Sequence, residues 1–211
     1  MMLPIVLSMF QSPDNVVLAA GDPPSKPRSS SEAPARNPQL RDELLGMLQA
    51  DQAARQPGHI DAKAMLAADT KNLARLKQII QEHGFPTISL VGTDGALATW
   101  LLAQHADSDP EFQKSVLAMM EPLVKAGEAS ATHFAYLYDR THTPQRYGTQ
   151  GRCVAKSVWA PRDIEDPEHV DQRRATVGLP PLSEYIASIE TAEGLCSAAD
   201  PAPPAVSGGR K

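Results

Sequence analysis

The sequence predicts a mainly α fold: a compact bundle of about six to seven helices with a small β-hairpin near residues 145–160. Apolar residues recur with a period near 3.6 through the middle of the chain, as they do along the buried face of a helix. A capping residue followed by proline, typical of a helix start, occurs at Asn37, Asp109 and Asp166. The chain of 211 residues is 42% hydrophobic and 21% charged, which is the balance of a globular domain.

The first predicted helix begins after the Asn37 cap, with Pro38 in its first turn, and ends before Pro57. Its apolar face is formed by leucines one turn apart: Leu40, Leu44 and Leu48.

The second predicted helix is the clearest in the sequence. It begins at the Asp61 cap and runs to His83, and Gly84 is placed to close it in the left-handed conformation. Six apolar residues form its stripe: Met65, Leu66, Leu73, Leu76, Ile79 and Ile80.

Three further segments complete the central helices. Residues 87–91 are interpreted as a buried connector, after which Thr93 or Asp94 caps a helix that ends near His105. Asp109 and Pro110 start the next helix, which Pro122 should kink or divide because proline lacks a backbone donor. Residues 128–139 are predicted to form another helix.

The helical period is lost between residues 140 and 165. Alternation over residues 147–150 and 154–159 predicts a hairpin that pivots near Gly151. Asp166 and Pro167 then start a helix that closes at Gly178, and a last short helix carries Leu182, Tyr185, Ile186 and Ile189.

Domain organisation follows from these segments. The helical domain spans residues 38–190, between a Pro/Ser-rich linker at 21–37 and a Pro/Gly-rich tail at 191–211, both too poor in apolar residues to fold. Residues 1–20 have two interpretations, a signal peptide or a frayed N-terminus, because two apolar runs are interrupted by polar residues and no Lys or Arg precedes them. We expect a cytoplasmic location, with export as the alternative.

Charge and cysteine content limit the classes of function. The net charge of −5 provides no positive field for phosphates, so we expect no nucleic-acid partner. No apolar stretch is long enough for a transmembrane segment. Cys153 and Cys196 are too few for a disulfide scaffold, and the sequence leaves open whether they pair. The oligomeric state is also left open.

The first candidate site lies at the end of the helix that precedes Asp109. Gln104 and His105 are followed by Asp107, and a carboxylate beside an imidazole can orient the ring for proton transfer. The structural alternative is that the helix dipole favours His105 and that Asp109 is only a cap.

The second candidate site is the segment from Tyr136 to Gly151. It contains Asp139, Arg140, Tyr147, Thr149 and Gln150, with glycines that would let backbone amides approach a ligand. The structural alternative is that Asp139 and Arg140 only fix the turn after the helix.

Metal and cofactor motifs are missing from the sequence. The six histidines show no HExxH spacing, and no Walker-type, dinucleotide-type or Gly-x-Ser-x-Gly segment occurs. We therefore expect no metal and no cofactor, although metal ligands from distant segments would leave no trace in the sequence.

A resemblance covers the predicted domain from Arg41 to Tyr185. The segments Gln104-His105-x-Asp107-x-Asp109-x-x-Phe112-Gln113, Tyr136-Leu-x-Asp139-Arg140, Gln145-x-Tyr147-Gly-Thr-Gln150 and Val170-Asp171-x-Arg173-Arg174, with Gly92, Gly95 and Trp100, resemble a bacterial family known only as a domain of unknown function. The resemblance implies homology without implying a reaction.

These observations together predict a domain that binds a small polar or anionic ligand in one polar pocket. If it is an enzyme, which the sequence does not decide, His105 would transfer a proton, Asp107 or Asp139 would orient it, and Arg140 with Gln150 would hold negative charge. Gln104, Tyr147 and Thr149 complete the predicted ligand-binding set. The alternative is a non-catalytic module that binds a protein partner.

Overall fold

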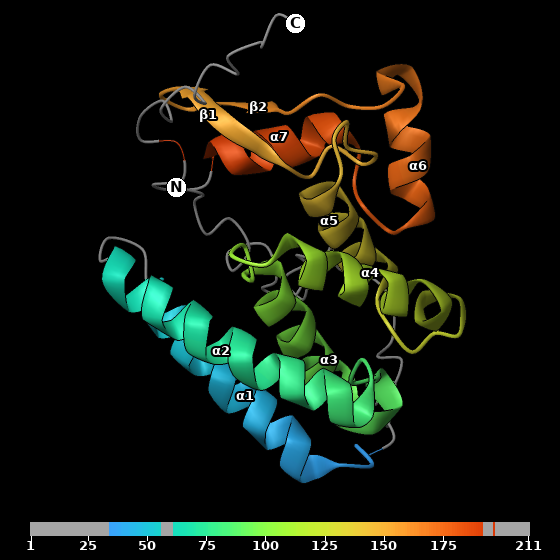
Figure 1. Cartoon of the computed structure of the whole chain (residues 1–211). Helices are drawn as coiled ribbons and strands as arrows, with labels where there is room; N and C mark the ends of the chain where they lie inside the picture. Colours follow the sequence, from blue (N-terminus) through green and yellow to red (C-terminus); the bar gives the residue numbers. More distant parts are fainter. Residues whose placement is uncertain (1–33, 56–60, 192–195, 197–211) are drawn as a thin grey trace, which may run out of the picture.

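The structure is a computed structural model, and it describes residues 34–55, 61–191 and 196. Within these residues it contains seven α-helices, one short 3₁₀ helix and one two-stranded antiparallel sheet, so the predicted mainly α class is confirmed (Figure 1). Residues 1–20, interpreted as a signal peptide or a frayed N-terminus, lie outside the described residues, as do most of the predicted linker and most of the predicted tail.

Helices α1 (Pro38–Ala53) and α2 (Ala62–His83) lie side by side and both contact α3 (Figure 1). Their predicted caps are confirmed. The Asn37 side chain accepts a hydrogen bond from the Leu40 amide, and the Asp61 carboxylate accepts from the amides of residues 63 and 64.

Helix α3 (Ile88–Gln104) begins earlier than the sequence predicts. Residues 88–91, expected to be a connector, already form a helical turn, and Gly92 then interrupts the helix with a φ of 77°. Gly95 packs closely on this turn, because a Cβ added there would lie 2.7 Å from the Val91 Cβ. A backbone break that glycine permits therefore replaces the predicted boundary.

Helices α4 (Pro110–Lys125) and α5 (Ala131–Thr141) pack against each other and against α3. Pro122 does not divide α4, since the helix runs unbroken to residue 125 and the proline lies in its last turn. The start of α5 is three residues later than predicted because Ser130 is its cap. Glu128, predicted to lie in that helix, instead accepts a hydrogen bond from the Ser89 amide at the start of α3.

The predicted hairpin is confirmed, but its turn does not lie near Gly151 as predicted. Strands β1 (Gly151–Ala155) and β2 (Val158–Pro161) pair in antiparallel register, so Gly151 begins the first strand and the turn lies at residues 156–157, where Ser157 has a positive φ of 55°. Gly151 must be glycine at this place, because a Cβ would approach the Trp159 ring to 2.1 Å and the Ala160 carbonyl to 2.4 Å.

The C-terminal part consists of a 3₁₀ turn (Pro167–His169), α6 (Val170–Thr176) and α7 (Leu182–Thr191), with β2 packed on α7 (Figure 1). Asp166 does not cap the turn as predicted; its φ is 44° and its carboxylate contacts His169 instead. A disulfide joins Cys153 on β1 to Cys196.

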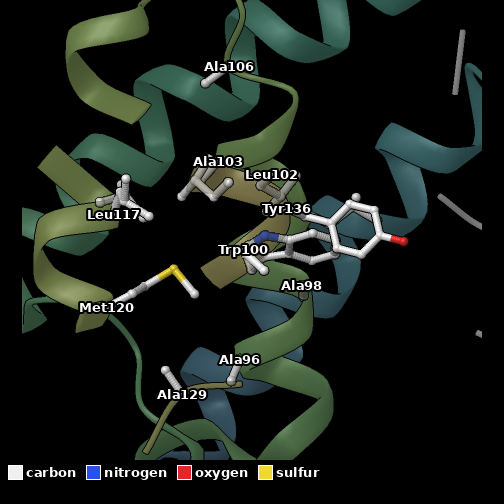
Figure 2. Packing of buried hydrophobic residues seen from close by; sticks show 14 of the residues in the cluster. Ala96, Ala98, Trp100, Leu102, Ala103, Ala106, Leu117, Met120, Ala129 and Tyr136 are labelled. Atoms are coloured by element: carbon white, nitrogen blue, oxygen red, sulfur yellow. The ribbon is translucent and has the colours of Figure 1, made fainter. Parts of the chain in front are cut away.

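The core forms where α3 meets α4 and α5. Trp100 is completely buried and stacks on His133 with ring centroids 4.2 Å apart, and its indole also meets the edge of Tyr136. Figure 2 shows Leu117 and Met120 of α4 on the opposite side of α3 from Tyr136. Small residues of α3, among them Ala96, Ala98 and Ala103, allow this close packing.

Candidate functional site

The turn that follows α3 carries the first group of predicted site residues. Asp107 leaves this turn toward the end of α5, where Arg140 donates two hydrogen bonds to its carboxylate, one of them from Nε at 2.9 Å. Arg140 also donates from Nη1 to the Gln150 side-chain oxygen at 3.3 Å. The Arg140 side chain is 12% exposed and that of Asp107 is 50% exposed, so the pair lies at the surface with its guanidinium largely covered.

The loop that follows α5 is organised by Asp139. Its buried carboxylate accepts hydrogen bonds from the backbone amides of Arg146, Tyr147 and Thr149 at 2.7–3.2 Å, and from the Thr149 hydroxyl at 2.9 Å. Burial raises the pKa of Asp139, while the hydrogen bonds from these amides act in the opposite direction. The Asp139 carboxylate therefore holds the backbone of this loop in place.

The neighbouring polar residues hold the same loop. Gln145 is buried and donates to the backbone carbonyls of Gln150 and Arg162 at 2.9 and 2.8 Å, while its own oxygen accepts from the Gln150 amide. The Thr149 carbonyl accepts from the Tyr185 hydroxyl at 3.0 Å. These bonds fix the backbone of the loop and leave the Gln150 side chain in contact with Arg140.

Arg162 is a second guanidinium beside Arg140. Its backbone amide donates to the Gln150 carbonyl at 2.9 Å, so residues 150 and 162 face each other just beyond the paired strands. Burial lowers the pKa of Arg162, and the positive charge of Arg140 lowers it further, while Asp107 raises it. Although its guanidinium is partly covered, Arg162 as a whole is exposed to solvent, and its side chain forms no hydrogen bond or ion pair within the described residues. We call Arg140 and Arg162 the arginine pair.

His105 contacts a different set of groups. As the residue that ends α3, it places Nδ1 at 2.9 and 3.0 Å from the two carboxylate oxygens of Asp51 on α1. Asp51 is also bound by Arg55, whose second terminal nitrogen reaches Asp69 on α2 at 2.6 Å. We call Asp51, Arg55, Asp69 and His105 the three-helix cluster.

The structure therefore places the predicted site residues in two groups on either side of one turn. Arg140 brings Asp107 and Gln150 together, and Asp139, Tyr147 and Thr149 hold the loop beside them. No hydrogen bond joins His105 to Asp107 or Asp139 within the described residues; its carboxylate partner is Asp51.

Gln104 is 2% exposed and is the last residue of α3. Its backbone carbonyl accepts a hydrogen bond from the Gln113 amide group at 3.1 Å, and Gln113 also reaches Asp107 at 3.4 Å. The Gln104 side-chain oxygen finds no hydrogen-bond donor in the described part of the chain.

Sequence reasoning missed Asp51, Arg55, Asp69 and Arg162. A signal for Asp51 was present: it falls seven residues after Leu44, on the face of α1 that buries Leu40 and Leu44, and it is itself fully buried. A carboxylate on an apolar helical face requires a buried partner. Arg162 gave no such signal, because its position depends on the register of the hairpin.

Arg173 and Arg174, from the last segment that carries the family resemblance, both bind backbone groups inside the protein. Arg173 donates to the backbone carbonyls of Arg146, Glu165 and Asp166. Arg174 is fully buried and donates to the carbonyls of Tyr147 and Pro180, both at 2.6 Å. Both side chains fasten α6 to the loops around it.

Among the described helices, none has the length and apolar character needed to cross a membrane.

Comparison with known proteins shows the family to which the chain belongs. No curated protein and no solved structure matches the chain. The profile of a family described as "Family of unknown function (DUF6624)" matches residues 38–198, which is most of the chain. The chain belongs to this family of unknown function, DUF6624.

Proposed function

We propose that this domain binds a small anionic ligand at the arginine pair, with a carboxylate or phosphate group held between Arg140 and Arg162. One observation carries the proposal: both arginines meet at Gln150, whose side-chain oxygen accepts a hydrogen bond from Arg140 at 3.3 Å and whose backbone carbonyl accepts from the Arg162 amide at 2.9 Å. Burial and then the positive charge of Arg140 lower the pKa of Arg162, which agrees with this placement. An anion between them would relieve this repulsion.

The geometry of the arginine pair supports binding with little rearrangement. Asp107 and the Gln150 side chain already hold the Arg140 guanidinium, so its orientation does not have to be fixed by the ligand. The backbone of Arg162 is fixed by the bonds of its amide and carbonyl to Gln150 and Gln145. Its side chain stays exposed, so a ligand can reach it from solvent.

The chemistry of guanidinium defines the ligand class. Its planar N–H groups match the two oxygens of a carboxylate or phosphate, and such charge-assisted hydrogen bonds are stronger than neutral ones. Because Asp107 already neutralises part of the charge, the site favours a ligand with one or two negative charges over a polyanion. This choice agrees with the acidic net charge of the chain.

The experiment is a calorimetric titration of the full chain with orthophosphate and with malonate. We expect one ligand per chain, and Arg162→Gln should weaken binding by at least about tenfold, as expected for loss of one charge-assisted contact. Arg140→Gln should weaken it as well, but this change also releases Asp107. Lys125→Gln is the matched control, because it removes a positive charge from an exposed residue at the end of α4.

Equal binding by wild type and Arg162→Gln would contradict the proposal. A second result would favour the protein-interaction alternative: no response to phosphate or malonate, together with Arg162-dependent binding of a short peptide rich in Asp and Glu. In that case the same two guanidinium groups would bind acidic side chains of a partner protein.

The acid/base function expected for His105 is not part of this proposal. Asp107, predicted to orient the ring, is bound to Arg140, and Asp139 is bound to the loop. The orienting carboxylate that the structure offers is Asp51, in a different group.

We further propose that the protein works in an oxidising compartment outside the cytosol. The support is the disulfide between Cys153 and Cys196, because such bonds are rare where cellular thiols keep cysteines reduced. Of the two locations considered from the sequence, this favours export.

A further inference from the structure

The three-helix cluster collects metal-ligating side chains from three separate elements. Asp51 comes from α1, Asp69 from α2 and His105 from the end of α3, and one ligand atom of each lies within 4.8 Å of the other two. Asp51 is fully buried, and the His105 side chain is 10% exposed. No short-spacing motif reveals this set, because its members are separated by 18 and 36 residues in sequence.

We propose that Asp51, Asp69 and His105 form a binding site for one divalent transition-metal ion, of which Zn²⁺ is the representative, and that Arg55 holds the cation position when no metal is bound. One imidazole nitrogen and two carboxylate oxygens are a ligand set that suits Zn²⁺ and related ions. The proposal is independent of the arginine pair.

Arg55 marks where a cation is stabilised in this cluster. Its Nη1 lies 2.7 Å from Asp51 Oδ1 and its Nη2 lies 2.6 Å from Asp69 Oδ1, so one positive group bridges two carboxylates. Asp51 Oδ1 is also 2.9 Å from His105 Nδ1. A metal ion would bind in the same place, and the guanidinium would have to move away.

The charges in the cluster favour a stronger cation than arginine. Two carboxylates face one guanidinium, and Asp51 is fully buried, so a cation that compensates both carboxylates is favoured there. A divalent ion in place of Arg55 compensates both carboxylates. Gln52, which donates to Asp51 Oδ2 at 2.6 Å, can keep that contact when Oδ1 binds a metal.

The distances are close to those a metal needs. Bonds of about 2.0–2.2 Å place the ligand atoms of a tetrahedral ion about 3.3–3.6 Å apart. The His105–Asp51 distance of 2.9 Å is close to this spacing, and all three ligand atoms lie within 4.8 Å of one another. The Asp69 side chain is 23% exposed. Three protein ligands leave a fourth position for water or a substrate, as in catalytic rather than structural zinc sites.

The test is titration of the full chain, freed of metal with a chelator, with Zn²⁺ by calorimetry and with Co²⁺ by visible absorption. We expect one ion per chain and Co²⁺ bands typical of four- or five-fold coordination. Asp69→Asn and His105→Asn should each weaken binding by more than about a hundredfold, since each removes a direct ligand. His83→Asn is the matched control, because His83 is a partly exposed histidine next to Glu82.

Arg55→Met supplies the decisive comparison. If Arg55 competes for the cation position, its removal should tighten Zn²⁺ binding by about tenfold or more, and Zn²⁺ should raise the melting temperature of this variant more than that of the wild type. Arg55→Lys serves the same purpose if the methionine variant does not fold without metal, since lysine cannot bridge both carboxylates with two nitrogens.

The proposal is overturned if the wild type binds no ion, if Asp69→Asn and His105→Asn bind as the wild type does, or if neither Arg55 variant binds more tightly. The cluster would then be a buried ion-pair network only. Failure here is separable from failure of the proposed anion site, because Arg162→Gln should leave Zn²⁺ binding unchanged and Asp69→Asn should leave phosphate binding unchanged.

Discussion

At the scale of single residues, Asp139 shows how a buried carboxylate can order a whole loop. It lies in the last turn of α5 and gathers three backbone amides and a hydroxyl from residues 146–149. The loop in turn carries Gln150, which contacts Arg140. Asp139 therefore positions one wall of the proposed anion site without touching the ligand.

Asp139→Asn tests this positioning role. The amide places an N–H₂ group where an oxygen accepted hydrogen bonds, so at least one buried donor loses its acceptor, and we expect a loss of about 2–3 kcal/mol in the free energy of unfolding. Urea denaturation measures it. Asp42→Asn, at an exposed position on α1, should change stability by less than about 0.5 kcal/mol. An equally small change in Asp139→Asn would show that the carboxylate does not hold the loop.

Single residues also mark how far the sequence could predict the site. Arg140, Asp107 and Gln150 were chosen because polar groups cluster in two short segments, and they do meet. The partner of His105 could not be predicted, because Asp51 is 54 residues away and is brought close only by the packing of α1 on α3. Long-range contacts of this kind depend on helix packing, which a residue pattern does not record.

At the scale of the elements, α3 and α5 are joined by an aromatic stack with a titratable member. His133 of α5 lies parallel to Trp100 of α3 at an interplanar angle of 8°. Burial lowers the pKa of His133 from 6.5 to about 4, because the charged ring would lose its hydration. Between these two values the folded chain keeps the ring neutral while the unfolded chain protonates it.

The sign of the resulting pH dependence follows directly. The unfolded state binds more protons between pH 6.5 and about 4, so this contribution to stability is complete above pH 6.5 and falls as the pH decreases through that window. From pH 7 to pH 5 we expect a loss of about 2 kcal/mol from His133. His133→Phe should remove most of this slope in denaturation curves, whereas His142→Phe, at an exposed position, should retain it. A slope that survives in His133→Phe would refute the assignment.

The start of a helix was predicted correctly where a capping side chain determines it. Boundaries that depend on the backbone conformation alone were predicted poorly. Asn37, Asp61 and Asp109 cap their helices as expected, since each carboxylate or amide oxygen accepts from the first turn. The hairpin turn was predicted at the wrong residue because it uses Ser157 at positive φ, an unusual residue for that conformation. The pattern offered Gly151 instead, but that glycine is required by the Trp159 ring.

At the scale of the whole molecule, the two proposed sites lie in different regions: the three-helix cluster joins α1, α2 and α3, and the arginine pair joins α5 to the strand segment. The turn from His105 to Asp107 contributes one residue to each. Because the two sites share this turn, measuring both ligands in the variants of each site tests whether the sites bind independently.

The compartment is also a property of the whole molecule. Fractionation of the native cells, with thiols trapped by a maleimide reagent before lysis, should place the chain outside the cytosol with both cysteines blocked until a reductant is added. A cytosolic chain with two reactive thiols would contradict the proposed location, because Cys153 and Cys196 form a disulfide in the folded structure.

The same disulfide determines how the chain would respond to mechanical tension. It bridges a sequence separation of 43 residues that includes β2, α6 and α7. A force applied to the two ends of the protein cannot stretch this segment while the bond is intact. The unfolded chain is therefore shorter by roughly 150 Å than it would be after reduction. Pulled molecules should therefore lengthen in a further step only after reduction, and the C-terminal part with its hairpin would act as a closed ring.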